Sequence, residues 1–364
     1  MAVKPIGVGI IGSGRIGRLR ANLIAQSPEV KFLALSDADA ARVELIAEEV
    51  GADFHSTDNE EVLTHPDVDA VVVSTPEHLH VEPICRALEL GKPVLTEKPL
   101  ALSLADADQI LSTLERTQGD LRVGYTQRFR RRFLNAKEQI TLGRLGRPLT
   151  ARLSRYSPRH MAEQIYKRSP HASPVTDSLT YMVDIGLWFF EGRKPVRVYA
   201  QGVNKIHAGH PSGVGDGAWA LVTLDDGSTL NLGCSWILPT NWPAPTTTMG
   251  MEILGTTGAI AIDDSHRETI MATMSGNAVP SPYAPNVSSD VVFFESMPAG
   301  DWLLGEFWGP MREEVRAFLE HVTTGRETPL TMPAAARTTL EVTLAIEQSA
   351  RTGQPIDLPL TAGG

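Results

Sequence analysis

Residues 6–17 read "IGVGIIGSGRIG", an apolar run that leads into Gly12-Ser13-Gly14-Arg15-Ile16-Gly17. A GxGxxG pattern is typical of a dinucleotide site when it follows a strand and opens a helix, and the flanking residues favour both elements. The first glycine permits a tight turn, the second lets a pyrophosphate approach the backbone, and the third lets the helix pack on the strand. We expect these six residues to hold a dinucleotide, with a purely structural glycine turn as the alternative.

The order of strand, turn and helix repeats along the first third of the chain. Residues 6–98 alternate apolar strands with amphipathic helices, and a last strand is expected at "LRVGY", residues 121–125. Such alternation is typical of a parallel sheet with crossover helices. The strand "VDAVVVST" at 68–75 is apolar almost throughout, as expected when helices cover both faces of the sheet. We therefore expect residues 1–124 to form an α/β Rossmann domain.

The pattern changes after residue 125. Strands with hairpin turns at Asp226-Gly227 and Thr257-Gly258 predict an α+β domain with a large open, mainly antiparallel sheet over residues 125–364. We expect a helix over 177–191, a long loop over the Pro-, Gly- and Ser-rich residues 276–300, and two late helices at 309–325 and 332–353. Both late helices begin near a proline and stop at a glycine, and the last one is expected to pack back towards the first domain.

Composition excludes several classes of protein. A chain of 364 residues with 42% hydrophobic and 21% charged residues is long enough for two domains. Its net charge of −10 argues against a nucleic-acid partner, and no window holds the roughly 18 apolar residues that cross a membrane. Cys85 and Cys234 lack CxxC and metal-ligand spacing, which fits buried thiols in a reducing compartment. With no room for a signal peptide before Ile6, we expect a cytoplasmic protein.

Positive charge gathers in one tract despite the acidic total. Between Arg128 and Arg168 there are twelve Lys or Arg residues and two acids, a local net charge of +10. One interpretation is a solvated or subunit-facing surface that pairs with acids elsewhere. The other is that part of the tract receives an anionic group on a small-molecule substrate, and the candidates for that role are Arg128, Arg152, Arg155 and Arg168.

Asp37 ends the second predicted strand, twenty residues after Gly17. A carboxylate at this position can accept hydrogen bonds from both ribose hydroxyls of an adenosine and would repel a 2′-phosphate. NAD is therefore the expected cofactor and NADP the less favoured one, although Arg15 and Arg18 could soften that preference.

Glu97 and Lys98, in "TEKPL" at 96–100, follow the next-to-last strand of the first domain. The carboxyl ends of parallel strands form the edge at which such sheets hold ligands. Pro99 favours an extended backbone at Lys98, so its ammonium is expected to point out of the sheet and to polarise a hydroxyl or pass a proton. A surface lysine at a strand end is the alternative.

Asp184, in "DIGLW" at 184–188, is a carboxylate set among apolar residues. Burying an unpaired polar group costs roughly 2 to 7 kcal/mol, so its position needs a reason. Helical spacing places it on one stripe with the polar or aromatic residues Asp177, Tyr181, Trp188 and Glu191. Such a stripe suits a ligand pocket, and the alternative is a capping Asp177 followed by a carboxylate paired with a core arginine.

The motifs in this order resemble the glucose-fructose oxidoreductase, inositol dehydrogenase and MocA family. They are the GxGxxG, Asp37, "TPEHLHVE" at 75–82, "EKPL" at 97–100, "GYTQRF" at 124–129, and an Asp in an early helix of a second domain. The resemblance covers nearly the full chain. It implies an NAD(P)-binding Rossmann domain and a C-terminal α/β domain whose open sheet makes homodimers or homotetramers.

The resemblance also implies roles for single residues. The family's EKP lysine, here Lys98, lies beside the nicotinamide and the substrate, and Arg128 matches a basic residue after the domain junction. The positions that match cofactor-lining residues of the family are Thr75, Pro76, His80 and Glu97. Asp184 matches the family's Asp, which faces the substrate hydroxyl together with a His four residues on.

Trp188 stands where the family has that His, and Trp cannot accept a proton. The remaining candidates for the acid/base are Lys98, Tyr181 and His171, and we favour Lys98 with Asp184 orienting the substrate hydroxyl. Trp188 would then be a flat apolar wall for a ring. The pair His207 and His210 has zinc-like spacing but no matching third ligand, so we expect no metal site.

We expect an NAD-dependent dehydrogenase that oxidises a ring hydroxyl of a sugar, cyclitol or related polyhydroxylated compound. The positive tract leaves open a carboxylated substrate, such as a sugar acid or a carboxylated cyclic diol or hemiacetal from aromatic catabolism. Two other classes also stay open: an enzyme that uses bound NAD for a redox-neutral reaction, and a non-catalytic NAD-responsive binding protein.

Overall fold

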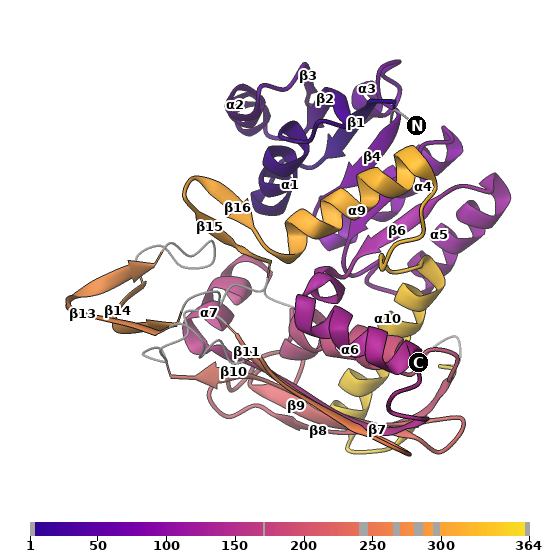
Figure 1. Cartoon of the computed structure of the whole chain (residues 1–364), viewed down its shortest axis with the longest axis vertical. Helices are drawn as coiled ribbons and strands as arrows, with labels where there is room; N and C mark the ends of the chain where they lie inside the picture. The colour runs from indigo at the N-terminus through magenta and orange to yellow at the C-terminus, as the bar shows by residue number, and fades with distance from the viewer. Residues whose placement is uncertain are drawn as a thin grey trace. The chain divides into compact units, whose positions relative to one another are not determined.

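The computed structural model describes residues 4–169, 172–239, 247–264, 270–279, 287–293 and 299–360. It divides into two compact units. The first contains Met1–Phe129 and Gly309–Leu340, and the second contains Arg130–Trp308 and Glu341–Gly364. Each unit is built around its own main sheet (Figure 1).

The first unit has a six-stranded parallel sheet with the order β3-β2-β1-β4-β5-β6. Its strands are β1 (Ile6–Ile11), β2 (Val30–Ser36), β3 (Phe54–Ser56), β4 (Ala70–Val73), β5 (Val94–Glu97) and β6 (Leu121–Gly124). This is the Rossmann order, in which the chain reverses direction across the sheet between β1 and β4 and leaves a crevice for a dinucleotide. All residues of β1 and β4 are buried, as the continuous apolar runs predicted.

Helices connect these strands. They are α1 (Arg15–Ala25), α2 (Ala40–Val50), α3 (Asn59–Leu63), α4 (Val81–Glu89) and α5 (Leu104–Thr117), with the 3₁₀ turns η1 (Glu77–Leu79) and η2 (Thr126–Phe129). Asp39 and Ser103 cap α2 and α5 by accepting hydrogen bonds from backbone N–H groups of the first turn. No helix among the described residues is long and apolar enough to cross a membrane.

Two late helices follow the second domain in the chain, at the predicted places: α9 (Pro310–Thr324) and α10 (Pro333–Thr352). The sequence predicts α9 as part of the second domain, whereas in the structure α9 packs on α1 and η2 of the first unit (Figure 1). Its apolar stripe, with Met311, Val315 and Phe318 buried, provides the packing surface. The division between the units falls inside α10, after Leu340.

The second unit has a seven-stranded sheet with the order β12-β11-β7-β10-β9-β8-β17. Its strands are β7 (Pro148–Pro158), β8 (Pro195–Val203), β9 (Gly217–Leu224), β10 (Thr229–Leu238), β11 (Thr248–Gly255), β12 (Ala259–Asp264) and β17 (Ile356–Asp357). All neighbours are antiparallel except β7 and β10. The predicted open, mainly antiparallel sheet is confirmed, with β9–β10 and β11–β12 joined at Asp226-Gly227 and Thr257-Gly258.

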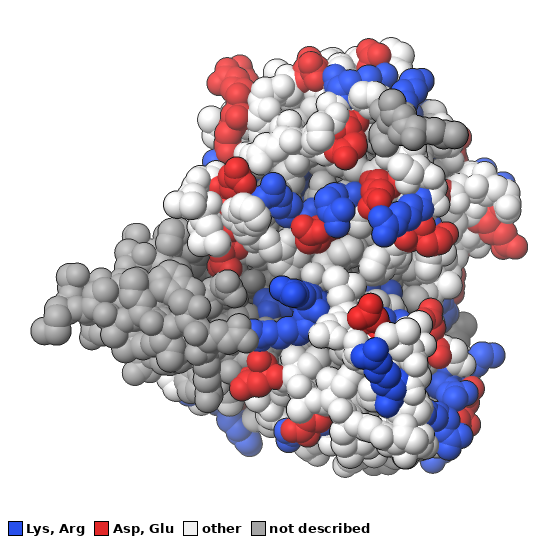
Figure 2. Space-filling view, in the orientation of Figure 1, with Lys and Arg blue, Asp and Glu red and all other residues white. Residues whose placement is uncertain are grey.

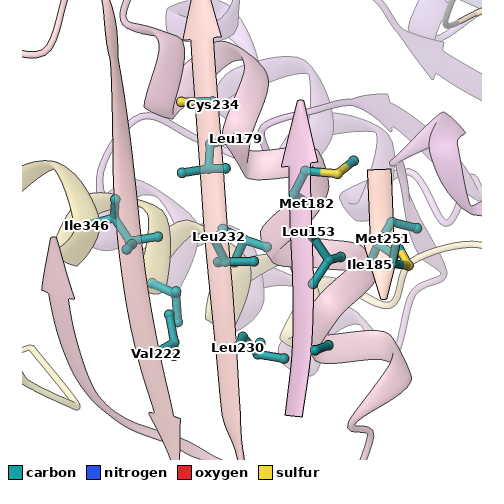
Figure 3. Packing of buried hydrophobic residues seen from close by; sticks show 14 of the residues in the cluster. Leu153, Leu179, Met182, Ile185, Val222, Leu230, Leu232, Cys234, Met251 and Ile346 are labelled. Carbon is teal, nitrogen blue, oxygen red and sulfur yellow. The ribbon is translucent and has the colours of Figure 1, made fainter. Parts of the chain in front are cut away.

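One face of this sheet forms the core of the second unit (Figure 3). Leu153, Val222 and Leu232 project from neighbouring strands towards Met182 and Ile185. The helices of this unit, besides the later part of α10, are α6 (Arg131–Thr141), α7 (Arg159–Arg168), the π-helical turn η3 (Pro174–Leu179) and α8 (Thr180–Phe189). The other face of the sheet carries exposed residues at alternate positions of β8 and β9.

Two expectations for the second domain were wrong in detail. The helix expected over 177–191 is a π-helical turn, η3, followed by the shorter α8. The loop expected over 276–300 contains parts of the paired strands β13 (Ile270–Val279) and β14 (Val287–Phe293), and the short strands β15 (Asp301–Leu303) and β16 (Glu306–Trp308) pair next. The rest of that expected loop, at 280–286 and 294–298, lies outside the described residues.

Candidate functional site

The glycine-rich loop has the geometry that a dinucleotide requires. Gly12 has φ +93°, and a Cβ there would lie 2.8 Å from the backbone of Ser74 and Thr75. A Cβ on Gly17 would lie 1.9 Å from the Gly12 carbonyl oxygen, so helix and strand could not approach as they do. At Gly14 a Cβ would meet nothing within 4 Å, which leaves open space beside the N-terminus of α1. Arg15 and Ile16 form the first turn of that helix.

Asp37 lies beside this loop, at the carboxyl end of β2. Its Oδ2 accepts a hydrogen bond of 2.8 Å from the Ser13 backbone N–H, and its Oδ1 accepts one of 3.0 Å from Arg42 Nη1. Oδ1 also accepts a hydrogen bond of 3.0 Å from the Asp39 backbone N–H, whereas Oδ2 keeps a second lone pair that can accept from a ribose hydroxyl. Arg42 was not among the sequence candidates, and it pairs with the carboxylate beside which a 2′-phosphate would be bound. Arg18, which was considered, is paired with Glu49 at 2.7 Å.

The segment after β4 supplies polar atoms opposite the glycine loop. The hydroxyls of Ser74 and Thr75 are buried and have no hydrogen-bond partner among the described residues. Orphaned hydroxyls beside an open glycine cradle fit a bound pyrophosphate or nicotinamide ribose. Pro76 is exposed and precedes η1. The residues around the loop therefore fit NAD.

His80 links two of the predicted cofactor loops to each other. Its Nδ1 lies 3.0 Å from the Pro99 carbonyl oxygen and its Nε2 lies 3.2 Å from that of Thr75. Burial lowers the pKa of His80, so the ring is neutral at pH 7 and donates to one of the two carbonyls. The side chain thus holds the Thr75 and Pro99 segments together.

Glu97 takes part in a buried ionic network that the sequence analysis missed. Arg20 Nε donates to Glu97 Oε1 at 2.7 Å, and Arg20 Nη2 donates to Glu314 Oε2 at 2.6 Å. Thr126 Oγ1 donates to the same Glu314 oxygen at 3.1 Å. A Cβ at Gly124 would lie 2.9 Å from Arg20 Nη2, so the glycine makes room for the network. The Glu97 side chain is thus held by Arg20 of α1, which is itself held by Glu314 of α9, and these contacts fix the backbone that carries Lys98.

Lys98 directly follows β5 and is half-buried. Its strand lies two places from β1 in the sheet, about 10 Å away at the usual strand spacing. Because all six strands are parallel, Lys98 and the glycine-rich loop lie at the same edge of the sheet. The structure thus brings together the loop, Asp37, Thr75 and Lys98.

Asp184 lies in α8 of the second unit and is buried, with 1% of its surface exposed. Tyr181, one turn earlier, is partly buried and stacks under Arg155, whose Cζ lies 4.7 Å from the ring centroid. The polar stripe predicted over residues 177–191 does not include its first and last residues. Asp177 lies in the π-helical turn before α8, and Glu191 is exposed and pairs with Lys137 at 2.8 Å.

Trp188 is partly buried at the end of α8. Lys137 Nζ lies 5.4 Å from its ring centroid and donates to its backbone oxygen at 2.7 Å. The Phe189 ring stacks beside it at 5.6 Å. The indole is therefore a flat surface with a cation at one side.

The positive tract contains both exposed and buried cations. Arg152 is exposed and pairs with Glu252 at 3.0 Å, and on the face drawn in Figure 2 positive and negative residues are intermixed. Arg128 and Arg155 are buried, with 6% of each exposed. Arg152 and Arg155 lie on opposite faces of β7, so they cannot serve one ligand group. His171 lies outside the described residues, as does the side chain of Arg168.

The two histidines of "HAGH" stabilise a loop. Asp216 accepts hydrogen bonds from three backbone N–H groups, of Lys205, Ile206 and His207, and from His207 Nδ1 at 2.9 Å. Burial opposes ionisation of Asp216, but these donors outweigh it and hold its pKa below the usual value. His210 stacks on Tyr166 with ring centroids 4.3 Å apart.

Two family models match the chain. The model described as "Oxidoreductase family, NAD-binding Rossmann fold" matches residues 6–125, and the "GFO/IDH/MocA C-terminal domain" matches residues 133–261. The resemblance that the motifs indicated is thereby confirmed, together with the predicted NAD cofactor and oxidoreductase class.

Similar proteins extend over the whole chain. The chain is 26% identical over 365 residues to the "Uncharacterized oxidoreductase YrbE" of Bacillus subtilis (strain 168), with 98% of both chains covered. It is 36% identical over 141 residues to the scyllo-inositol 2-dehydrogenase (NAD(+)) of the same organism, covering 38% of this chain and 41% of that one.

Solved structures show the same fold. The scyllo-inositol dehydrogenase from Lactobacillus casei with bound cofactor NAD(H) and scyllo-inositol has a TM-score of 0.77 at 21% identity, covering 97% of this chain and 99% of the other. Motifs, fold and both domain matches agree: the chain belongs to the GFO/IDH/MocA family of NAD-binding oxidoreductases.

Proposed function

We propose that the protein is an NAD-dependent dehydrogenase that acts on CH–OH groups and oxidises a ring hydroxyl of a cyclitol, sugar or related compound. The observation that carries the proposal is the open cradle at Gly14, at the same sheet edge as Lys98. The names of similar proteins support the substrate class, since several are inositol dehydrogenases.

Bound NAD supplies a hydride acceptor, so the ring carbinol loses a hydride to the nicotinamide and a proton to a base, and becomes a ketone. Lys98 is the group proposed to take the hydroxyl proton. Lys98 is half-buried at the sheet edge where the cofactor is proposed to bind, and a lysine amine can take a proton from a hydroxyl held beside it. Asp184 is proposed to accept a hydrogen bond from a substrate hydroxyl and so orient it. Trp188 offers a flat surface to the ring.

Absorbance at 340 nm tests this proposal, with purified protein and NAD against inositols, aldoses, sugar acids and carboxylated dihydrodiols. NADH formation with one substrate class is expected, and Lys98→Met should lower kcat about 10²- to 10⁴-fold while leaving the Kd for NAD unchanged. Tight NAD binding without NADH formation from any class would contradict the proposal and favour a redox-neutral reaction or a binding protein.

We also propose that the protein is a homo-oligomer that pairs through the open face of the second sheet. That face carries the exposed apolar side chains Tyr199, Trp219 and Leu221, which lie next to each other on β8 and β9. Contiguous exposed apolar side chains on a sheet are costly in water and typical of a subunit interface.

A further inference from the structure

The core face of β7 changes from apolar to polar along the strand. Ala151 and Leu153 project into the core of the second unit, and the next two residues on the same face are Arg155 and Ser157. Arg155 is buried, with 6% exposed, and Ser157 is fully buried. A guanidinium is charged at every physiological pH, so its burial needs a counter-charge or a set of acceptors.

Arg155 has an aromatic neighbour, and it forms no ion pair with an acidic residue in the part of the chain that the structure describes. Its guanidinium stacks on Tyr181, with Cζ 4.7 Å from the ring centroid. The residues paired with it across the sheet are Cys234 on β10 and Met249 on β11, neither of which carries a charge at neutral pH. Nε and Nη1 of Arg155 are buried and lack a hydrogen-bond partner among the residues that the structure describes.

Two further side chains near Arg155 are buried without a hydrogen-bond partner among the described residues. The hydroxyls of Ser157 and Thr247 are buried and also lack a partner within the described ranges. Ser157 lies about 7 Å along the strand from Arg155, on the same face. Thr247 directly precedes β11, whose first residue Thr248 pairs with Tyr156, the neighbour of Ser157. We call Arg155, Ser157 and Thr247 the Arg155 cluster.

The cluster matches one chemical group. Buried N–H donors on a delocalised cation, with hydroxyls beside them, suit a carboxylate, which is planar, singly charged and accepts up to four hydrogen bonds. A phosphate dianion would bring a second negative charge, which would need a second cation. Arg152, the other arginine of β7, cannot supply it, because it lies on the opposite face of the strand and pairs with Glu252.

We propose that the Arg155 cluster binds a carboxylate of the substrate, so that the protein prefers ring polyols or hemiacetals that carry an acid group over neutral inositols. Tyr181 connects the cluster to the proposed reaction site, because it lies on α8 three residues before Asp184 and such residues are neighbours on a helix. This inference rests on the proposed function for its substrate, but not for the binding of the carboxylate itself.

Binding measured without turnover tests the cluster. Calorimetry of the full-length protein with saturating NAD would use cyclohexanecarboxylate as the probe and cyclohexanol as its neutral control. The wild type should bind the carboxylate at least 10-fold more tightly than the alcohol. Arg155→Met should weaken carboxylate binding about 10- to 100-fold, since hydrogen bonds to a charged group are lost. Arg152→Met, on the opposite face of the same strand, is the matched control and should change nothing.

Folding of the variants is checked in the same samples. An apolar side chain in place of a buried cation without an acidic partner should leave the melting temperature equal or higher. Arg155→Lys keeps the charge but loses the planar donors, and an intermediate affinity is expected. Equal binding of the carboxylate by the wild type and Arg155→Met, or equal binding of carboxylate and alcohol by the wild type, would overturn the inference.

The two proposals can fail separately. If carboxylates bind through Arg155 but no polyol yields NADH, the proposed function is wrong and the carboxylate site stands. If neutral inositols are turned over as well as their acid counterparts and Arg155→Met has no effect on KM, the carboxylate site is wrong and the dehydrogenase stands.

Discussion

Arg20 and Glu314 are 294 positions apart in the chain and form an ion pair of 2.6 Å in which both side chains are fully buried. Arg20 comes from the helix after the glycine-rich loop, and Glu314 comes from α9. Through its second contact, to Glu97, Arg20 also holds the residue before Lys98. The pair thus connects α9 to the helix that follows the glycine-rich loop and, through Glu97, to the end of β5 just before Lys98.

Stability should fall with rising pH because of Glu314. Burial raises the pKa of Glu314 to about 7 from its ordinary 4.5, with Arg20 opposing this shift. Between these values the unfolded chain has released a proton that the folded chain keeps, so each pH unit in that window costs about 1.4 kcal/mol of stability. Urea unfolding should show the wild type losing stability relative to Glu314→Gln from pH 5 to 7. A pH-independent difference between the two proteins would contradict this assignment.

The glycines of the loop should separate folding from cofactor binding. Gly17→Ala places a methyl group 1.9 Å from the Gly12 carbonyl oxygen, so we expect a protein that is unfolded or strongly destabilised. Gly14→Ala enters open space and should keep the wild-type melting temperature, but weaken NAD binding at least 10-fold. Fluorescence titration with NAD, together with thermal melts, checks both. Unchanged NAD affinity in Gly14→Ala would place the cofactor elsewhere.

Coenzyme choice should depend on Asp37 and Arg42. Asp37→Ser removes the acceptor for ribose hydroxyls and the repulsion of a 2′-phosphate, while Arg42 is left to pair with that phosphate. We expect the ratio of kcat/KM for NAD to that for NADP to fall about 10²-fold or more. Adding Arg42→Ala to Asp37→Ser should remove the gain for NADP. If the double variant uses NADP as well as the single one, Arg42 has no part in coenzyme choice.

The exposed sheet face should control the oligomeric state. Charges introduced by Trp219→Glu and Leu221→Glu would be buried without partners in an interface, so sedimentation should show monomers. Leu45→Glu changes a more exposed apolar side chain of α2 and serves as the control, with no shift expected. A monomeric wild type, or an oligomer that survives both charges, would refute the proposed interface.

The sequence specified the first unit well because its signals are local. Gly12 and Gly17 are required by the backbone geometry around them, Gly14 leaves open space for a ligand, and Asp37 lies where a twenty-residue spacing after Gly17 predicts it. Arg20 and Glu314 could not be paired in advance, because no local pattern links positions so far apart. Arg42 carried a weak signal, its place in the first turn of the helix after Asp37.

In the second unit, the polar stripe predicted from helical spacing around Asp184 was partly wrong. An α-helical period assumed for residues 177–191 put Asp177 and Glu191 with Asp184, but a π-helical turn and an early helix end break that period. Arg155 is one of the twelve cations between Arg128 and Arg168, and the count alone does not distinguish it from Arg152. In the structure Arg155 is buried, whereas Arg152 is exposed and pairs with Glu252. Charge counts report composition, whereas the face of the strand decides which cation is available to a ligand.

We propose that this chain transfers a hydride from a ring carbinol to NAD with Lys98 as the base. The most direct measurement is the ratio of NADH to ketone formed from the best substrate of the panel, for the wild type and for Lys98→Met. We expect one NADH for each ketone in the wild type and a rate at least about 10²-fold lower in the variant, with NAD still bound. Product formation without NADH, or an undiminished rate in Lys98→Met, would contradict it.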